Sequence, residues 1–309
     1  MTEPSRPLAA MILAAGLGTR LRPLTDALPK PLVWIGNLPA ISHVLSSIEV
    51  AAPSATVINS FYNASKLSEF VRDSGREVAI SEETTLLGTA GGVARAFARN
   101  LFPAGSDLVI WNGDILSDLD VRALARVHGA ESPLATLAVR ARPKGEGSVG
   151  IDAEGRIVRL RTTSVSAEER GGDFLGISVI SEACLSLLPG EGCLVGDAWI
   201  PALLRGETVR ALVTTANTHD IGSIDAYARA NFEWLARHAN VMNAKDPANA
   251  SYVAESAEVA GEVFRAIIGA GAEIGGSVRN SIVWPNTFDE GPLEDVIAGP
   301  GFRVPLPRR

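Results

Sequence analysis

Apolar and polar positions in the first 140 residues follow the pattern of strands alternating with helices. An apolar run over residues 8–15 is long enough for one buried strand of a parallel sheet. Residues 39–50 and 63–71 place apolar side chains at helical spacing, and short β-branched runs at 55–58 and 78–80 predict further strands. This alternation predicts an α/β fold with a Rossmann-like, doubly wound and mostly parallel sheet.

The second half of the chain predicts a domain boundary. An amphipathic helix over residues 224–235 closes the first domain, and the polar stretch 240–250 is typical of a linker. We therefore expect one domain over residues 1–240 and a second region over residues 241–309. In that region Val253 and Val259 are six residues apart, and so are Ile268 and Ile274, which predicts a hexapeptide-repeat β-helix of about two coils.

The first predicted strand runs directly into a glycine turn, Gly16-Leu17-Gly18-Thr19-Arg20. Its two glycines allow backbone N–H groups to approach a phosphate chain closely. Arg20 and Lys30 supply two cations, and the prolines on both sides of Lys30 predict an extended backbone there. A dinucleotide-binding turn would need a third glycine where Leu21 stands, and no Walker A motif occurs. The turn therefore favours a polyphosphate ligand.

Composition narrows the class of protein. Lys and Arg number 28 against 35 Asp and Glu, a net charge of −7, which argues against non-specific nucleic-acid binding. No apolar run is long enough to span a membrane, so no membrane partner is expected. The two cysteines, Cys184 and Cys193, form neither a metal spacing nor a disulfide framework, which fits a cytoplasmic protein.

Residues 13–32 resemble the signature of the sugar-phosphate nucleotidyltransferases, the family that makes nucleoside-diphosphate sugars. The pattern G-x-G-T-R-L-x-P-L-T followed by P-K-P-L is complete here. The resemblance implies catalytic roles for Arg20 and Lys30. It also implies that the following residues bind the nucleotide: Ala14, Ala15, Gly16, Gly18 and Thr19.

Further motifs of the same family follow along the chain. The L-G-T-A-G turn at residues 87–91 implies that Gly88 and Thr89 read the nucleobase, although Thr89 would equally suit a helix N-cap. The N-G-D motif implies that Asn112 contacts the nucleotide and that Asp114 ligates Mg²⁺, where an aspartate at a strand end is otherwise a turn residue or a cap. The D-I-G-S motif implies Asp220 as the second Mg²⁺ ligand.

The sugar-phosphate side of the site is less complete. Resemblance to the family's sugar-pocket segments singles out Gly150, Gly176 and Asp197, the last of which would also suit a helix cap. The lysine-bearing E-K-P stretch of the family is absent, so the cation that anchors the sugar phosphate is open. Arg159 and Arg161 share one face if they lie in a strand, and Arg161 is our candidate, with two surface arginines as the alternative.

Together these residues predict an enzyme that uses Mg²⁺ to transfer a nucleoside monophosphate from an NTP to a sugar 1-phosphate. The L-G-T-A-G turn is most similar to that of the mannose- and heptose-1-phosphate guanylyltransferases, so GTP is expected. A uridylyl- or thymidylyltransferase and a non-catalytic regulatory subunit are the alternatives. A hexapeptide acyltransferase is disfavoured, because no histidine follows His238.

The family resemblance extends loosely to the C-terminal region, which is similar to a left-handed parallel β-helix. Two coils bury little apolar area alone, so the region needs a partner. The partner would be the preceding helix near Phe232 and Trp234, or the same region of another subunit, with Trp284 suited to either contact. We expect a homo-oligomer through this segment.

Overall fold

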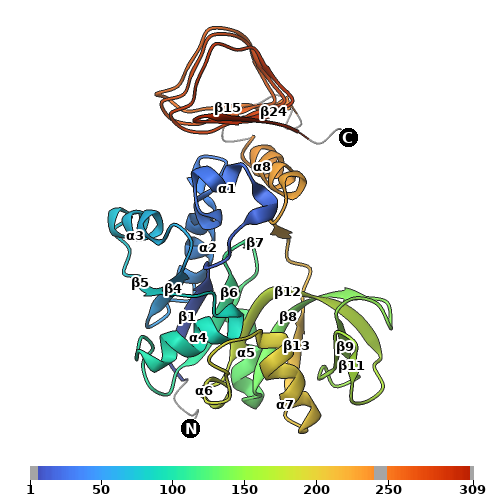
Figure 1. Ribbon diagram of the computed structural model, residues 1–309. Coiled ribbons are helices and arrows are strands. Elements are labelled where there is room, and N and C mark those ends of the chain that lie inside the picture. Colours follow the sequence, from blue (N-terminus) through green and yellow to red (C-terminus); the bar gives the residue numbers. More distant parts are fainter. Residues whose placement is uncertain (1–5, 240–248, 307–309) are drawn as a thin grey trace. The chain divides into compact units, whose positions relative to one another are not determined.

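The computed structural model describes residues 6–239 and 249–306. The chain folds into two compact units, and Figure 1 labels their helices and strands. Unit 1 comprises Met1–Gly16 and Val44–Thr218, and unit 2 comprises Leu17–His43 and His219–Arg309. The boundary predicted at residue 240 stays a prediction, because most of the predicted linker lies outside the described residues.

Unit 1 is built on one large mixed sheet. Its strands are β1 (Leu8–Leu13), β4 (Thr56–Ser60), β5 (Ala79–Glu82), β6 (Asp107–Asn112), β8 (Ala135–Arg142), β9 (Val149–Ile151), β10 (Ile157–Leu160), β11 (Thr163–Ser164), β12 (Arg170–Ile180) and β13 (Val209–Val213), and a short β7 (Ile115–Ser117) follows β6. The sheet order is β11-β10-β9-β12-β6-β1-β4-β5, with β8 between β12 and β13. Strands β5, β4, β1 and β6 are parallel, as the alternating pattern predicts.

The antiparallel part of the sheet contains the long strand β12 and the strands β9, β10 and β11, with β10 antiparallel to both β9 and β11. β12 runs antiparallel to β6, β8 and β9. The helices of this unit are α3 (Ala64–Asp73), α4 (Gly88–Ala98), α5 (Val121–Glu131), α6 (Glu182–Leu185), the π-helix Leu194–Trp199 and α7 (Ile200–Leu204), while α2 (Ala40–Glu49) crosses the division between the units. The core is formed by apolar strand residues such as Met11 and Ile110 together with Trp199, all buried.

Unit 2 joins the signature segment to the C-terminal part of the chain. Its elements before the β-helix are the 3₁₀ turns Thr19–Leu21 and Lys30–Leu32, α1 (Leu24–Ala27), β2 (Trp34–Ile35), β3 (Leu38–Pro39) and α8 (Ile224–His238), with β14 (Thr218–Asp220) at the division between the units. Two buried side chains of α8 bind the backbone that directly follows the signature segment. Tyr227 Oη donates to the Trp34 carbonyl at 2.6 Å, and Asn231 Oδ1 accepts from Gly36 N at 2.8 Å.

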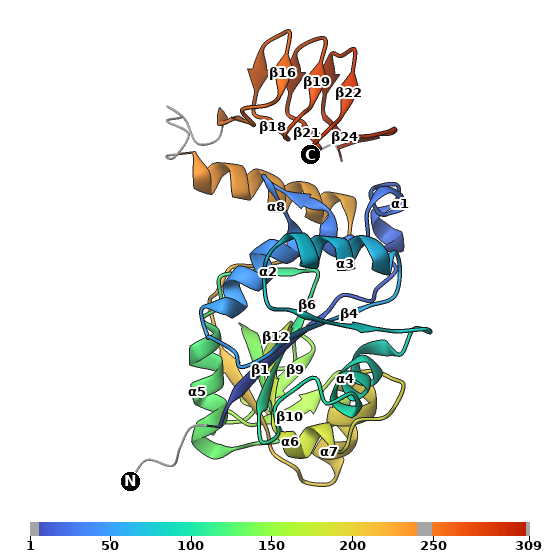
Figure 2. The same ribbon diagram turned by 90° about the vertical axis from the view of Figure 1, so that its left-hand side faces the viewer.

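The C-terminal region is a short parallel β-helix with three stacks of strands (Figure 2). One stack contains β15 (Tyr252–Val253), β18 (Ile267–Ile268), β21 (Ile282–Val283) and β24 (Val296–Gly299). The second contains β16 (Glu258–Val259), β19 (Glu273–Ile274) and β22 (Phe288–Asp289), and the third contains β17 (Val263–Phe264), β20 (Val278–Arg279) and β23 (Leu293–Glu294). β25 (Phe302–Pro305) pairs antiparallel with β24 at the end of the stack.

The repeat differs from the predicted hexads. Tyr252 pairs with Ile267, and Ile267 with Ile282, so each coil takes 15 residues rather than three hexads. Val253 and Val259 lie on adjacent sides of one coil, so their six-residue spacing spans a corner instead of defining the period. The prediction of about two coils was therefore too low, because the described residues contain three coils and the start of a fourth.

The β-helix docks onto α8 within unit 2. Leu235 of α8 belongs to a buried cluster with Ala250 and Ile267. Trp284 is 2% exposed, and its Nε1–H donates to Tyr227 Oη at 2.8 Å. Of the two partners expected for Trp284, the structure therefore shows the helix of the same chain. No helix among the described residues is long and apolar enough to cross a membrane.

Candidate active site

In unit 1, the start of the glycine turn is held by a buried asparagine. β1 pairs with β4 in parallel, with Leu13 opposite Asn59. The next residue, Ala14, donates its N–H to Asn59 Oδ1 at 2.7 Å. Asn59 is 2% exposed, so this hydrogen bond is shielded from water. The backbone of Ala14, which resemblance places at the nucleotide, is thereby fixed where the strand ends.

Asn59 is also linked to the L-G-T-A-G turn through Glu83. Asn59 Nδ2 donates to Glu83 Oε1 at 2.6 Å, and Leu87 N donates to Glu83 Oε2 at 3.1 Å. Glu83 is 3% exposed, and no ion pair to it is found in the part of the chain that the structure describes. A buried carboxylate without a cation depends on such N–H donors. Two segments assigned to the nucleotide are thus joined by one continuous network.

Sequence reasoning missed Asn59 and Glu83, although a signal was present. Asn59 is a polar residue near the carboxyl end of the buried strand β4. Ligands in open α/β sheets bind at the carboxyl ends of strands, so polar residues there are candidates for the site or its support. Glu83 follows β5 in the same way.

The L-G-T-A-G turn starts α4 at Gly88. Gly88 has a left-handed φ of 73°, and a Cβ there would lie 2.3 Å from the Gly192 carbonyl oxygen, so only glycine fits. Thr89 Oγ1 accepts from Leu194 N at 2.8 Å, and α4 has no side-chain cap at its N-terminus. The interpretation of Thr89 as a helix cap is therefore wrong. Its hydroxyl instead binds the first residue of the π-helix.

The N-G-D motif lies directly beside the end of β1. Asn112 is opposite Leu13 in the parallel pair β1–β6, and Gly113 N donates to the Leu13 carbonyl at 2.8 Å. Gly176 of β12 packs against Asn112, because a Cβ on Gly176 would lie 2.9 Å from Asn112 Nδ2. Two candidate residues far apart in the sequence are thus in contact, and Asp114 follows in the turn before β7.

Arg161 lies outside β10, in a left-handed conformation with φ of 55°. It therefore does not share a strand face with Arg159, which corrects that expectation. Arg161 donates to Cys193 Sγ at 3.2 Å. Burial opposes ionisation of the Cys193 thiol, but the N–H groups of Gly196 and Val195, with Arg161 and Thr89, outweigh it and lower its pKa. Arg161 is thus aimed at the segment that contains Asp197.

Asp197 and Gly150 both have structural partners. Asp197 lies in the π-helix, where its Oδ2 accepts from Cys193 N at 2.7 Å. Gly150 lies under Glu168, whose carboxylate pairs with Arg159 Nε at 2.7 Å. The hydrogen bond from Arg159 lowers the pKa of Glu168, against the opposing effect of burial. Arg159 is therefore occupied within the hairpin, which leaves Arg161 as the sugar-phosphate candidate of this pair.

In unit 2, the 3₁₀ turn Thr19–Leu21 places Arg20. The turn begins after Gly18, which has φ of 63°, and Leu21 N donates to the Gly18 carbonyl at 2.9 Å. Arg20 and Asp220 meet at Gly222. A Cβ on Gly222 would lie 2.7 Å from Asp220 Oδ1 and 2.8 Å from Arg20 Nη2. The phosphate-binding candidate and one metal-binding candidate are therefore adjacent in this unit.

Lys30 begins a 3₁₀ turn instead of lying in an extended segment. Pro29 is extended, but Leu32 N donates to the Pro29 carbonyl at 2.8 Å and Val33 N to the Lys30 carbonyl at 3.3 Å. The steric preference of the residue before a proline is thus overridden by the hydrogen bonds of the turn. The expectation of an extended backbone at Lys30 is wrong, although both prolines still restrict it.

The donor chemistry fits Mg²⁺, a hard cation that takes oxygen ligands and keeps several waters. Asp114 and Asp220 are the carboxylates predicted to bind it, and Asp220 Oδ1 accepts a hydrogen bond from Gly222 N at 2.7 Å, which orients it. No group of three or more His, Cys, Asp or Glu side chains that could hold a metal occurs within residues 6–239 and 249–306. A dedicated all-protein metal cage is therefore not found in this part of the chain.

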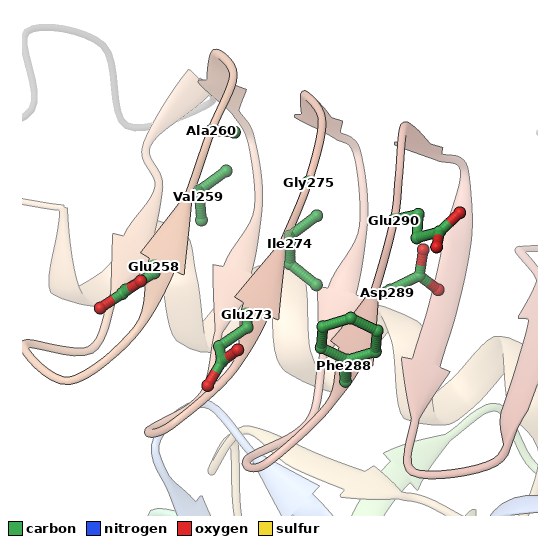
Figure 3. Close-up of a pocket in the computed structure, with 9 residues that line it drawn as sticks. All are labelled: Glu258, Val259, Ala260, Glu273, Ile274, Gly275, Phe288, Asp289 and Glu290. Carbon is green, nitrogen blue, oxygen red and sulfur yellow. The ribbon is translucent and has the colours of Figure 1, made fainter.

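Two cavities lie away from these motifs. One, of about 430 Å³, is an open groove on the β-helix (Figure 3). Its lining includes four carboxylates, those of Glu258, Glu273, Asp289 and Glu290. The other, of about 460 Å³, is lined by Leu8 and Asp107, the first residues of β1 and β6. The first groove would repel phosphate, and the second lies at the amino ends of the strands.

Comparison with known proteins agrees with these motifs. Residues 9–162 match the family model described as nucleotidyl transferase. A probable mannose-1-phosphate guanylyltransferase 1 of Oryza sativa subsp. japonica is 28% identical over 280 residues, covering 88% of this chain and 76% of the relative. A UTP--glucose-1-phosphate uridylyltransferase of Synechocystis sp. is 27% identical over 242 residues, covering 72% of this chain and 62% of the relative.

The fold has a counterpart among solved structures. The crystal structure of HddC from Yersinia pseudotuberculosis complexed with GMP-PN superposes with a TM-score of 0.60 at 22% identity, covering 73% of this chain and 99% of that chain. At this identity the likeness shows the shared fold alone. The family match, the relatives and the signature motifs agree with one another. This chain belongs to the nucleotidyl transferase family.

Proposed function

We propose that this protein transfers a nucleoside monophosphate from an NTP to a sugar 1-phosphate and releases pyrophosphate. The observation that carries the proposal is the network Ala14–Asn59–Glu83–Leu87, which joins the glycine turn to the L-G-T-A-G turn. A rigid link between a phosphate-binding and a base-binding segment is what a nucleotide substrate requires. The rice relative is named a probable mannose-1-phosphate guanylyltransferase, which supports GTP with mannose 1-phosphate, and heptose 1-phosphate is proposed on the resemblance of the L-G-T-A-G turn.

In the proposed reaction, a phosphate oxygen of the sugar 1-phosphate attacks the α-phosphorus of the NTP. The new P–O bond forms as the bond to the β-phosphate oxygen breaks, and pyrophosphate leaves with that electron pair. The attacking oxygen is already anionic, so no general base is needed. Catalysis then depends on positioning and on stabilising charge, as in other phosphoryl-type transfers.

Each proposed role follows from charge and position. Arg20 and the N–H groups of the glycine turn hold the departing pyrophosphate, and Lys30 neutralises charge at the α-phosphate or the sugar phosphate. Arg161 is the proposed cation for the sugar phosphate. Mg²⁺, held by Asp114 and Asp220, would supply further positive charge to the phosphates when bound. Activated substrates of this kind and two free cysteines fit a cytoplasmic location.

The experiment is a matrix of four NTPs against a panel of sugar 1-phosphates, read by pyrophosphate release with and without Mg²⁺. We expect the highest kcat/KM with GTP and mannose or heptose 1-phosphate. A preference for UTP or dTTP would change the proposed nucleotide substrate and leave the proposed type of reaction unchanged. Binding of a nucleotide sugar without pyrophosphate release from any pair would replace the enzyme by a regulatory subunit.

A further inference from the structure

Thr25 is buried beneath the glycine turn of unit 2. It belongs to the short helix α1, and it is 1% exposed. Its Oγ1 donates to the Gly18 carbonyl at 2.8 Å. Its Cγ2 lies 2.8 Å from the position that a Cβ on Gly18 would take. One side chain therefore supports the turn through both its hydroxyl and its methyl group.

The carbonyl that Thr25 binds is also the one that closes the turn carrying Arg20. Leu21 N donates to the same Gly18 oxygen at 2.9 Å. A carbonyl oxygen has two lone pairs, and here each receives one donor. With both used, the peptide plane after Gly18 has a fixed direction. That plane leads into the 3₁₀ turn Thr19–Leu21, so it fixes where Arg20 starts.

The same contact point reaches the segment that carries Lys30. The missing Cβ of Gly18 would lie 3.1 Å from Lys30 Cβ, in addition to its approach to Thr25 Cγ2. Gly18, Thr25 and Lys30 therefore meet at one place. Any side chain at residue 18 would separate them, and loss of the Thr25 hydroxyl would release one side of the contact.

We propose that Thr25 is a positioning residue that sets the placement of Arg20 and Lys30 for catalysis. The inference rests on the proposed function, because those two side chains are assigned to the phosphates there. Thr25 is buried and acts through Gly18, against which Lys30 also packs. Charge that develops in the transition state depends on exact placement of such cations, so the effect should fall mainly on kcat.

Two variants separate the hydroxyl from the methyl group. Thr25→Val keeps the branched shape and removes the donor, while Thr25→Ser keeps the donor and removes the methyl group. We expect Thr25→Val to lower kcat by about 10-fold or more, with a smaller change in KM for the NTP. Thr25→Ser should stay near the parent. If Thr25→Val does not fold, Thr25→Ser becomes the test. A kcat of Thr25→Ser that is lower than the parent's by about 10-fold would overturn the claim that the hydroxyl positions the two cations.

The matched control is Thr136→Val. Thr136 is a fully buried threonine on β8, and its Oγ1 is hydrogen-bonded to His128 Nδ1 at 3.0 Å. This control should lose thermal stability and keep the parent kcat. A Thr25→Val variant that behaves like the control, with lower thermal stability but parental kcat, would show a merely structural role and overturn the proposal.

A binding measurement separates this proposal from the proposed function. Calorimetry with inorganic pyrophosphate and Mg²⁺ should give weaker binding to Thr25→Val than to the parent. Weaker binding in a protein that turns over no NTP would reject the proposed reaction and keep the role of Thr25. A parent that turns over NTP, with Thr25→Val matching it in kcat and in pyrophosphate affinity, would reject the role of Thr25 and keep the reaction.

Discussion

Arg20 sits in a 3₁₀ turn that starts after a left-handed glycine, and its guanidinium reaches the backbone of Gly222. A cation held this way needs little reorganisation when charge develops on a leaving group. Arg20→Ala should therefore lower kcat by roughly 100-fold, the scale for loss of one preorganised donor. The measurement is pyrophosphate release at saturating NTP and Mg²⁺. Near-parental turnover would remove Arg20 from the mechanism.

The carboxylates of Asp114 and Asp220 have a separate test. An amide oxygen is a weaker ligand than a carboxylate for a hard cation. Asp114→Asn and Asp220→Asn should each raise the Mg²⁺ concentration needed for half-maximal activity, with circular dichroism unchanged. Asp118→Asn is a matched control, because Asp118 is engaged by Asn217 through hydrogen bonds of 2.8 and 3.0 Å. Parental Mg²⁺ titrations of both test variants would place the metal elsewhere.

At the scale of elements, Asn59 of β4 is linked to the L-G-T-A-G turn through Glu83, and the donor and acceptor of this link can be exchanged by substitution. In the Asn59→Asp variant two carboxylates face each other. In the Glu83→Gln variant the NH₂ of the new amide faces either Asn59 Nδ2 or Leu87 N, and both of these are also donors. The double variant restores every bond. Its carboxylate at position 59 accepts from Ala14 N and from the amide at position 83, and the oxygen of that amide accepts from Leu87 N. We expect each single variant to raise KM for the NTP and lower stability, and the double variant to recover both.

A double-mutant cycle measures this coupling. Residues in one buried hydrogen-bond network couple by about 0.5–3 kcal/mol, and we expect a favourable value toward the upper end of that range. The cycle is run on kcat/KM for the NTP and on urea unfolding. Additive effects of the two substitutions on kcat/KM would mean that the network supports the fold without positioning the nucleotide.

The sequence predicts elements well where hydrophobic periodicity is long. The helices predicted at residues 39–50 and 63–71 are α2 and α3. It fails where hydrogen bonds far apart in the chain decide the conformation. Threonine often caps helices, but the Thr89 hydroxyl accepts a hydrogen bond from the N–H of Leu194, which is 105 residues away. At Lys30 the failure is local instead, because prolines flank the residue but the hydrogen bonds of its own turn set its backbone.

The residues of the candidate site show the same contrast between local sequence patterns and contacts that form only in the folded chain. Motif resemblance predicts roles for the glycine turn and the strand-end aspartates, because those motifs are continuous in the sequence. It does not find Asn59 or Glu83, because their role appears only when β1, β4 and β5 are placed side by side. The 15-residue coil was missed for a related reason. Corners of unequal length hide a period that only the pairing of Tyr252 with Ile267 reveals.

At the scale of the whole molecule, the β-helix changes what the expected oligomer can rest on. Trp284 and the cluster around Leu235 are buried against α8 of the same chain, so they are not free to contact another subunit. The most exposed large apolar side chain described is Phe288, at 75%, on the acidic groove of the β-helix. A homo-oligomer through the C-terminal segment remains our proposal, and Phe288 is the residue on which it would now depend.

Two substitutions separate docking within the chain from assembly between chains. Trp284→Phe removes the bond from Nε1 to Tyr227 Oη and keeps most of the ring, so it should lower the free energy of unfolding by about 1 kcal/mol. Its sedimentation should match the parent, because Trp284 is covered within the chain. Phe288→Ser should leave unfolding nearly unchanged and, where the parent sediments as an oligomer at micromolar concentration, shift it toward the monomer. Dissociation by Trp284→Phe with Phe288→Ser still assembled would assign the subunit contact to the α8 side. A parent that is monomeric throughout would reject assembly and leave the dock on α8 as the function of the β-helix.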